Sequence, residues 1–316
     1  MTERLAVGVI GVGSMGQHHA RVYHELPTVD LVGVADVDAQ QAAETAEAYG
    51  TTPMSVDSLL SVADAVSIVV PTEYHYEMGM AAIEAGVDLL IEKPIAGDPS
   101  TGRELLTAAD EAGLTLQVGH VERFNPAVRT LSEIATELDV IALDCQRLGP
   151  PTKREIGDGV AMDLMIHDAD ILLSLVDSPV ADIYAAETAA DQYVATTVEF
   201  ENGVVATLTA SRVTQQKVRT LSVTAEECRV TVDYMAQSVR INRHSLPEYI
   251  ESDGDVRYRH ENVTERPTVE NGEPLKKELT SFAETVRTGG EPVVSAADGI
   301  RALEFVRRVT AEAASE

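Results

Sequence analysis

The stretch Arg4-Leu-Ala-Val-Gly-Val-Ile-Gly-Val-Gly-Ser-Met-Gly16 decides the fold of the N-terminal half of the chain. Its apolar part, Arg4–Ile10, is typical of a short strand, and residues 17–26 after the last glycine are typical of a helix. The pattern G-x-G-x-x-G between a strand and a helix predicts a dinucleotide-binding turn. A glycine turn with a purely structural role is the alternative.

The three glycines have different predicted roles. Gly11 permits a tight turn, Gly13 allows the close approach of a pyrophosphate, and Gly16 lets the helix pack on the strand. Ser14 and Met15 complete the loop at the helix N-terminus, where backbone N–H groups bind phosphate. We therefore predict that these residues bind the cofactor.

An acidic residue follows at the distance that this fold requires. The second apolar run, Asp30–Asp36, ends 36 − 16 = 20 residues past Gly16. A carboxylate at this distance is expected to bind the ribose hydroxyls. Val37 follows in place of an arginine, so no nearby cation would accept a 2′-phosphate. The sequence therefore favours NAD over NADP.

Strands and helices alternate up to residue 120, which predicts a parallel sheet. Further strands are expected at Ala65–Val70, Val87–Ile91 and Leu114–Gly119. Ligands in such sheets bind beyond the carboxyl ends of the strands. The side chains that follow these ends are further cofactor candidates: Pro71, Thr72, His75, Glu92 and Lys93. We predict that residues 1–120 form a Rossmann dinucleotide-binding domain.

The pattern changes in the second part of the chain, residues 121–316. Alternating segments between residues 181 and 242 predict strands, and helical patterns occupy residues 125–138, 274–288 and 296–311. We expect an α/β domain with an open, mostly antiparallel sheet. Threonines alternate with apolar residues in Val194–Thr209, so one sheet face is semi-polar. Another subunit covering that face would give a homodimer or homotetramer.

The composition excludes several classes of partner. A net charge of −28 over 316 residues argues against nucleic acid and anionic membranes. No run of about 18 apolar residues is present, so no membrane span is expected. The predicted first strand begins at Arg4, so no signal peptide is expected, and Cys145 and Cys228 form no motif. We therefore expect a cytoplasmic protein. The charge and only five lysines indicate adaptation to a salt-rich cytoplasm.

Asp163 and His167 are the strongest candidates for chemistry in the C-terminal half. They lie four residues apart in the apolar stretch Gly159–Asp170, so on a helix both face the same side. A carboxylate that orients an imidazole makes a general base. A buried helix with one internal hydrogen bond is the alternative. No metal site is expected, because no third ligand follows at a recognisable spacing.

Three motifs together resemble the glucose–fructose oxidoreductase/inositol dehydrogenase family (Gfo/Idh/MocA) over nearly the whole chain. They are the glycine loop, Glu92-Lys93-Pro94 and Asp163-x-x-x-His167. The resemblance implies that His167 takes a hydroxyl proton while a hydride passes to the nicotinamide. It implies that Lys93 hydrogen-bonds the same oxygen and that Asp163 orients the histidine. It also implies a cofactor contact for His75 and a Lys93–Pro94 bond that is often cis.

A narrower resemblance concerns Val118–Ala127 and Asp163–Asp168, which are similar to the branch that oxidises the 3-hydroxyl of UDP-N-acetylglucosamine. It implies a UDP-sugar as the small-molecule substrate. The implied substrate-binding residues are Lys93, His120, Arg123, Asn125, Arg154, Asp163 and His167. Asn125 equally fits a helix start before Pro126. Arg147, Lys153 and Arg154 are phosphate candidates, with surface solvation as the alternative.

Two other functions stay open at this point. One is a dehydrogenase of a free polyol or sugar, such as myo-inositol. The other is a catalytically silent NAD-binding regulator. The intact lysine, aspartate and histidine argue against the regulator, and residues 122–126 favour the nucleotide sugar by resemblance.

Overall fold

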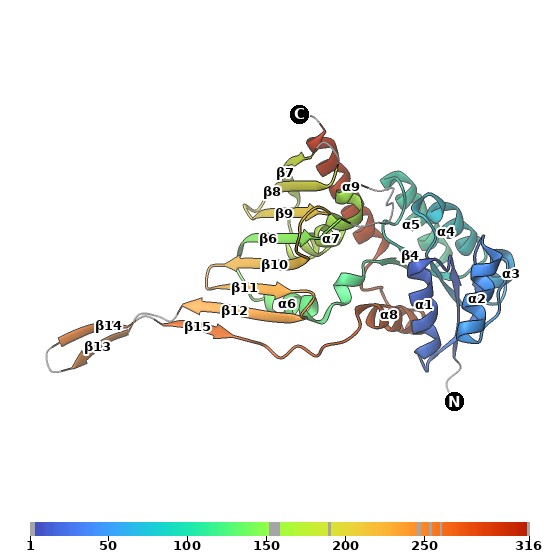
Figure 1. Ribbon diagram of the computed structural model, residues 1–316, viewed down its shortest axis with the longest axis horizontal. Coiled ribbons are helices and arrows are strands. Elements are labelled where there is room, and N and C mark those ends of the chain that lie inside the picture. The colour runs from blue at the N-terminus through green and yellow to red at the C-terminus, as the bar shows by residue number, and fades with distance from the viewer. Residues whose placement is uncertain are drawn as a thin grey trace. The chain divides into compact units, whose positions relative to one another are not determined.

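The chain is described by a computed structural model (Figure 1), which covers residues 4–151, 159–188, 191–244, 248–252, 255–259 and 261–314. It divides into two compact units, each built from two segments. The first comprises Met1–Phe124 with Glu273–Glu304, and the second Asn125–Gly272 with Phe305–Glu316. The division predicted from sequence, 1–120 and 121–316, runs linearly along the chain, whereas part of the C-terminal segment packs with the first unit.

The first unit contains a five-stranded parallel sheet with the order β2-β1-β3-β4-β5. Its strands are β1 (Leu5–Ile10), β2 (Val29–Ala35), β3 (Ala65–Ile68), β4 (Asp88–Glu92) and β5 (Leu116–Gly119). Nearly continuous apolar runs form these strands, as expected for a sheet covered on both faces. Strand β1 lies between β2 and β3, so the connection from β2 to β3 crosses to the other side of β1. Such a switch point marks the ligand-binding edge. The predicted Rossmann fold is confirmed.

Helices connect and cover these strands. The described helices of the N-terminal segment are α1 (Ser14–Glu25), α2 (Ala39–Tyr49), α3 (Val56–Leu60), η1 (Thr72–Tyr74), α4 (His75–Glu84), α5 (Pro99–Ala112) and η2 (Val121–Phe124). Capping residues fix where two of them begin. Asp38 accepts hydrogen bonds from the N–H groups of Gln40 and Gln41, and Asp98 accepts one from the N–H of Ser100.

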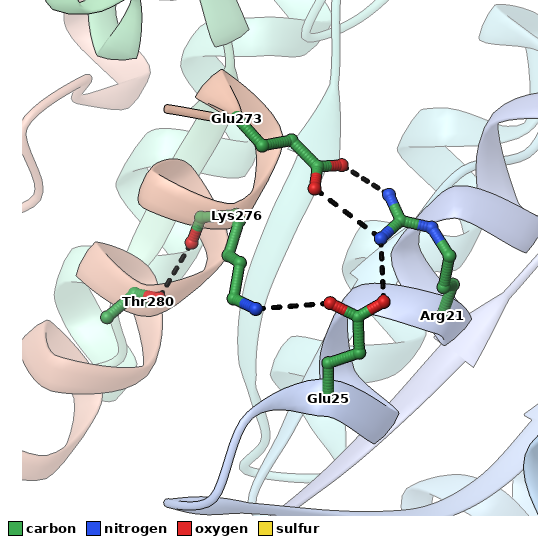
Figure 2. A network of polar contacts seen from close by, with 5 residues as sticks. All are labelled: Arg21, Glu25, Glu273, Lys276 and Thr280. Atoms are coloured by element: carbon green, nitrogen blue, oxygen red, sulfur yellow. Dashed lines mark hydrogen bonds and ion pairs between the residues drawn. The ribbon is translucent and has the colours of Figure 1, made fainter. Parts of the chain in front are cut away.

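Helix α8 (Pro274–Thr288) returns to the first unit because its apolar side chains join the core of that unit. Leu279 and Phe282 are fully buried in one cluster with Tyr23 of α1 and Leu90 of β4. Polar contacts also connect α1 with the start of α8 (Figure 2). Arg21 pairs with Glu25 and Glu273, while Lys276 Nζ lies 3.1 Å from Glu25 Oε2. The last helix, α9, spans Ala296–Ala313.

The second unit contains an eight-stranded sheet with the order β15-β12-β11-β10-β6-β9-β8-β7. Its strands are β6 (Val140–Leu148), β7 (Val180–Glu187), β8 (Tyr193–Phe200), β9 (Val205–Ser211), β10 (Val218–Ala225), β11 (Cys228–Asp233), β12 (Ser238–His244) and β15 (Asn262–Glu265). Only the described pair β6–β9 is parallel, so the predicted mostly antiparallel sheet is confirmed. Strands β13 (Glu248–Ser252) and β14 (Asp255–Arg259) pair separately.

The two faces of the eight-stranded sheet differ. A row of paired residues that are all buried crosses seven strands: Ile183, Val198, Ala206, Leu143, Val223, Val230 and Ile241. The neighbouring row on the opposite face contains Tyr184, Thr197, Thr207, Asp144 and Ser222, and Tyr184 is 54% exposed. Figure 1 shows helices α6 (Pro126–Ala135) and α7 (Ile166–Leu175) lying against the sheet. No described helix is long and apolar enough to cross a membrane.

Candidate active site

The glycine loop between β1 and α1 forms a cradle that fits a pyrophosphate. Gly11 has a φ of +86°, and a Cβ there would lie 2.6 Å from the carbonyl oxygen of Val69. A Cβ at Gly16 would overlap the carbonyl oxygen of Gly11. The space beside Gly13 is open except for Gln41 Nε2 at 3.9 Å, and no side chain caps α1. Because the first N–H groups of a helix attract anions, this arrangement fits the phosphates of a dinucleotide.

Asp36 is fixed at the end of β2 by two backbone hydrogen bonds. Its Oδ2 accepts from the Val12 N–H at 2.7 Å, and its Oδ1 accepts from the Asp38 N–H at 2.9 Å. The carboxylate is therefore held beside the glycine loop, where each oxygen keeps a further lone pair for a ribose hydroxyl. Val37 is fully exposed. The ribose contact itself stays a prediction.

Replacing Asp36 with alanine should raise the dissociation constant for NAD roughly tenfold or more, because hydrogen bonds to a charged group contribute about 1.5–3 kcal/mol. Titration of the protein with NAD measures this. Asp36→Asn is the matched control, since its oxygen still accepts from Val12 without the charge. An unchanged dissociation constant in the alanine variant would place the ribose-binding acid elsewhere.

Lys93 lies directly after β4. The residues on either side of it, Glu92 and Pro94, each contact a buried histidine. His19 Nε2 of α1 is 3.1 Å from Glu92 Oε1, and Glu92 Oε2 accepts from the Lys93 N–H at 3.2 Å. The Lys93–Pro94 bond is cis, as the family resemblance implied. His75 Nδ1 lies 2.8 Å from the carbonyl oxygen of Pro94. The residues on both sides of Lys93 are thus held by contacts with helices α1 and α4.

His75 also connects the loop after β4 to the loop after β3. Its Nε2 lies 2.9 Å from the carbonyl oxygen of Val70, just before Pro71 and Thr72. The side chain is 1% exposed, and both ring nitrogens face carbonyl oxygens. Its predicted cofactor contact stays a prediction. The structure adds that His75 holds together two loops at the predicted ligand-binding edge.

The carboxylate of Glu92 is stabilised in its charged form. Burial raises the pKa of Glu92, but its hydrogen bond to His19 and the charges of His19 and Lys93 outweigh that effect, so its pKa lies below the ordinary value. Gly119 makes room for this group, since a Cβ there would lie 3.0 Å from Glu92 Cδ. A negative charge is therefore fixed next to Lys93. Sequence analysis did not single out His19 for this role, because its partner is 73 residues away.

The remaining first-unit candidates follow β5. His120 is 1% exposed, and Arg123 lies in η2. Arg123 Nη2 is 3.9 Å from Asp298 Oδ1, and Asp298 Oδ2 accepts hydrogen bonds from Ser295. Burial alone would raise the pKa of Asp298, but hydrogen bonds from Ser295 and Arg301 and the charge of Arg123 hold it below its usual range. The predicted contacts of His120 and Arg123 with substrate stay predictions.

Asp163 and His167 lie where a π-helical turn, η3 (Ala161–Met165), leads into α7. Four residues of an α-helix advance by about 400°, roughly 40° more than a full turn. A π turn takes more residues per turn, so this overshoot shrinks and the two side chains come closer to one line along the helix. Asp163 Oδ2 accepts a hydrogen bond from Arg212 Nη2 at 2.8 Å. Sequence analysis missed Arg212, although a charged residue directly after a predicted strand is a usable signal.

Arg147 is a correction to the sequence analysis. The sequence analysis predicted that Arg147 either binds phosphate or is solvated at the surface. Instead, it is 1% exposed and forms a bidentate pair with Asp168, the neighbour of His167. Arg147 Nε and Nη2 donate to Asp168 Oδ2 and Oδ1 at 2.7 and 3.0 Å. The guanidinium also lies 5.4 Å from the ring centroid of Tyr234. Arg147 of β6 is therefore paired with the buried carboxylate of Asp168, and this pair fixes the first turn of α7 on β6.

Asn125 begins α6, as the alternative interpretation of this residue predicted. Its Oδ1 accepts from the Ala127 N–H at 3.1 Å, and its Nδ2 donates to the carbonyl oxygen of Tyr234 at 3.1 Å. The side chain is buried, and its contact with substrate stays a prediction. Lys153 and Arg154 lie outside the described residues. The structure thus groups Lys93 with the cofactor candidates in the first unit, and Asp163, His167 and Asn125 in the second.

Comparison with known proteins agrees with the fold described above. Residues 5–120 match the family described as "Oxidoreductase family, NAD-binding Rossmann fold", and residues 143–231 match the "GFO/IDH/MocA C-terminal domain". The chain is 37% identical over 242 residues to UDP-N-acetylglucosamine 3-dehydrogenase of Acidithiobacillus ferrooxidans, covering 75% of this chain and 76% of that protein. The chain belongs to the Gfo/Idh/MocA oxidoreductase family. NAD as the cofactor and oxidoreductase as the enzyme class are thereby confirmed.

Two further relatives extend the comparison within the Gfo/Idh/MocA family. A solved structure of the Acidithiobacillus ferrooxidans enzyme superimposes with a TM-score of 0.90 and 31% identity, over 98% of this chain and 97% of that one. Inositol 2-dehydrogenase 3 of Saccharopolyspora erythraea is 31% identical over 183 residues, covering 55% of this chain and 54% of that protein. The fold is therefore shared with the solved relative, while the two relatives differ in the substrate that their names give.

Proposed function

We propose that this protein oxidises the 3-hydroxyl of UDP-N-acetylglucosamine to the 3-keto sugar with NAD. One observation supports this substrate above the others. The relative named for that reaction is 37% identical over three quarters of the chain, and its solved structure matches over nearly the full length. The resemblance of residues 118–127 to the same branch agrees with it.

The reaction removes a proton from the hydroxyl oxygen and a hydride from C3. NAD, when bound, supplies the hydride acceptor. In this proposal His167 takes the proton and Lys93 donates a hydrogen bond to the oxygen, stabilising its developing negative charge. Asp163 orients the imidazole. The fixed backbone around Lys93 and the packed start of α7 support these roles, because a positioned group loses little freedom when the substrate binds.

A free polyol or sugar is the second candidate substrate. Inositol 2-dehydrogenases among the relatives favour it, at 31% identity over about half of the chain. A catalytically silent regulator is a weaker alternative, because Lys93, Asp163 and His167 are all present.

Mixing the protein with NAD and each sugar in high salt, and following NADH absorbance, separates these functions. We expect NADH with UDP-N-acetylglucosamine and little with myo-inositol or free N-acetylglucosamine. Signal with myo-inositol alone would select the polyol dehydrogenase. Tight NAD binding without NADH from any sugar or polyol would select the regulator.

We also propose that the protein is a homodimer or homotetramer. The support is the semi-polar sheet face, where the row from Tyr184 to Ser222 carries three hydroxyl-bearing threonine and serine side chains. Such a face can pack against the same face of a second copy, with hydrogen bonds between the side chains of the two copies. Light scattering in salt should give a multiple of 33.9 kDa, and a monomeric mass would contradict the proposal.

The charge balance supports a salt-rich cytoplasm as the location. With a net charge of −28, the chain repels itself at low ionic strength, and salt screens that repulsion. Activity and folding should therefore fall when salt is removed. Equal activity with and without salt would contradict this proposal.

A further inference from the structure

Arg212 makes a close ion pair that the proposed reaction does not yet use. Its Nη2 donates to Asp163 Oδ2 at 2.8 Å, and the side chains are 9% and 25% exposed. Both residues belong to the second unit, but they are 49 residues apart in the chain. A paired guanidinium and carboxylate with so little exposure hold each other in one geometry far better than a solvated pair does.

The backbone of Arg212 is held in place. Its N–H donates to the carbonyl oxygen of Gln192 at 2.9 Å. The preceding residue, Ser211, ends β9, and its carbonyl oxygen accepts from the Gly149 N–H at 2.9 Å. Its hydroxyl oxygen accepts from the Val213 N–H at 3.1 Å. The guanidinium is therefore presented from a rigid strand end.

Asp163 lies in a helical segment of unusual geometry. It occupies the middle of the π-helical turn η3, and π turns are rare and occur mostly at functional sites. Its N–H donates to the carbonyl oxygen of Gly159 at 2.9 Å. Asp191, from the loop between β7 and β8, accepts from the Val160 N–H at 3.3 Å. The start of this helix is thus fixed from two neighbouring loops, by Asp191 through the backbone and by Arg212 through the carboxylate.

We propose that Arg212 is a positioning residue for the sugar oxidation, acting through Asp163. It holds one carboxylate oxygen at the strand end, and this sets the direction in which the other oxygen points relative to His167 on the next turn. The inference rests on the proposed function for its catalytic consequence. Its structural part, that the direction of Asp163 depends on Arg212, does not depend on which sugar is oxidised.

A double-mutant cycle tests the coupling between the two residues. The variants are Arg212→Gln, Asp163→Asn and the double variant, with kcat and KM for UDP-N-acetylglucosamine as the readout. Arg212→Gln should lower kcat roughly tenfold with little change in KM for NAD, because Asp163 then loses the partner that directs it toward His167. Coupled side chains in contact deviate from additivity, so the double variant should be no slower than Asp163→Asn alone. Losses that multiply in the double variant would overturn the proposal.

Two further variants separate positioning from folding. Arg212→Lys keeps the positive charge and should recover a large part of the lost kcat. Thr214→Ala is the matched control, since it removes the hydrogen bond from Thr214 Oγ1 to the Gly149 carbonyl oxygen near the same strand end without touching Asp163. It should leave kcat within about twofold, as expected for loss of one neutral hydrogen bond away from the chemistry. An equal loss of kcat in Thr214→Ala and Arg212→Gln would overturn the proposal.

A readout without substrate distinguishes this inference from the proposed function. The imidazole resonance of His167, assigned with a His167→Gln variant, should shift in Arg212→Gln as it does in Asp163→Asn, and no further in the double variant. If these shifts occur but no sugar is oxidised, the coupling stands and the proposed function fails. If the resonance does not shift in Arg212→Gln, the proposal about Arg212 is wrong whatever the substrate.

Discussion

Replacing Lys93 with methionine should lower kcat by roughly 10²-fold or more, while NAD still binds. Losing a positioned group that stabilises the developing oxyanion has an effect of this size. Methionine keeps the length of the side chain and removes its charge and hydrogen-bond donors. Steady-state rates with UDP-N-acetylglucosamine measure the loss, and titration with NAD in the absence of sugar measures binding.

The control for this variant is Lys217→Met, which removes one of the same five lysines from an exposed position. Its rate should equal that of the unchanged protein. Wild-type turnover in Lys93→Met would mean that the loop after β4 supplies no catalytic group. Loss of NAD binding in the same variant would instead assign Lys93 to the cofactor alone.

Replacing Arg147 with methionine should destabilise the second unit by about 3–5 kcal/mol, because it leaves the Asp168 carboxylate buried without its partner. Both side chains are almost fully buried, at 2% and 3% exposure. Urea unfolding, followed by a probe in the second unit, measures the loss, since the two units need not unfold together.

The double variant Arg147→Met/Asp168→Leu is the informative control. Removing both charges leaves no unpaired group, so most of the stability should return. Arg103→Met removes the exposed pair with Glu304 and should barely change stability. A small loss in Arg147→Met, similar to that of Arg103→Met, would show that water reaches Asp168 and that the pair does not fix the start of α7.

Buried histidines give the first unit a similar internal support. His19 and His75 come from α1 and α4, and they contact the residues immediately before and after Lys93. Helix α1, the loop after β3 and the loop after β4 are therefore connected through histidine side chains that solvent does not reach. This arrangement keeps the lysine backbone in place without using the lysine side chain itself.

Local sequence patterns predicted the architecture because the strands of the first unit are apolar runs, and β1, β2, β4 and β5 end at or next to a glycine, an acid or the Glu-Lys-Pro motif. The second sheet was predictable where one face is buried, as in β8 and β9. Strands β13, β14 and β15 were not predicted. All four residues of β15 are exposed, so no apolar alternation marks it.

The contacts around the candidate site could not be predicted from the sequence, since they join distant residues. Arg147 and Asp168 are 21 residues apart, and Asp163 and Arg212 are 49 apart. Nothing local distinguishes a buried arginine from a solvated one before its carboxylate partner is known. The π-helical turn was also not visible, because its residue pattern is that of an ordinary apolar helix.

The most direct test of the central claim uses UDP-N-acetylglucosamine carrying deuterium at C3 of the sugar. After incubation with the protein and NAD, mass spectrometry should find the deuterium in the reduced cofactor, together with a keto sugar nucleotide. Reduced cofactor without deuterium would show that the hydride leaves another carbon. No reduced cofactor with this sugar, but rapid reduction with myo-inositol, would contradict the assignment to a sugar nucleotide.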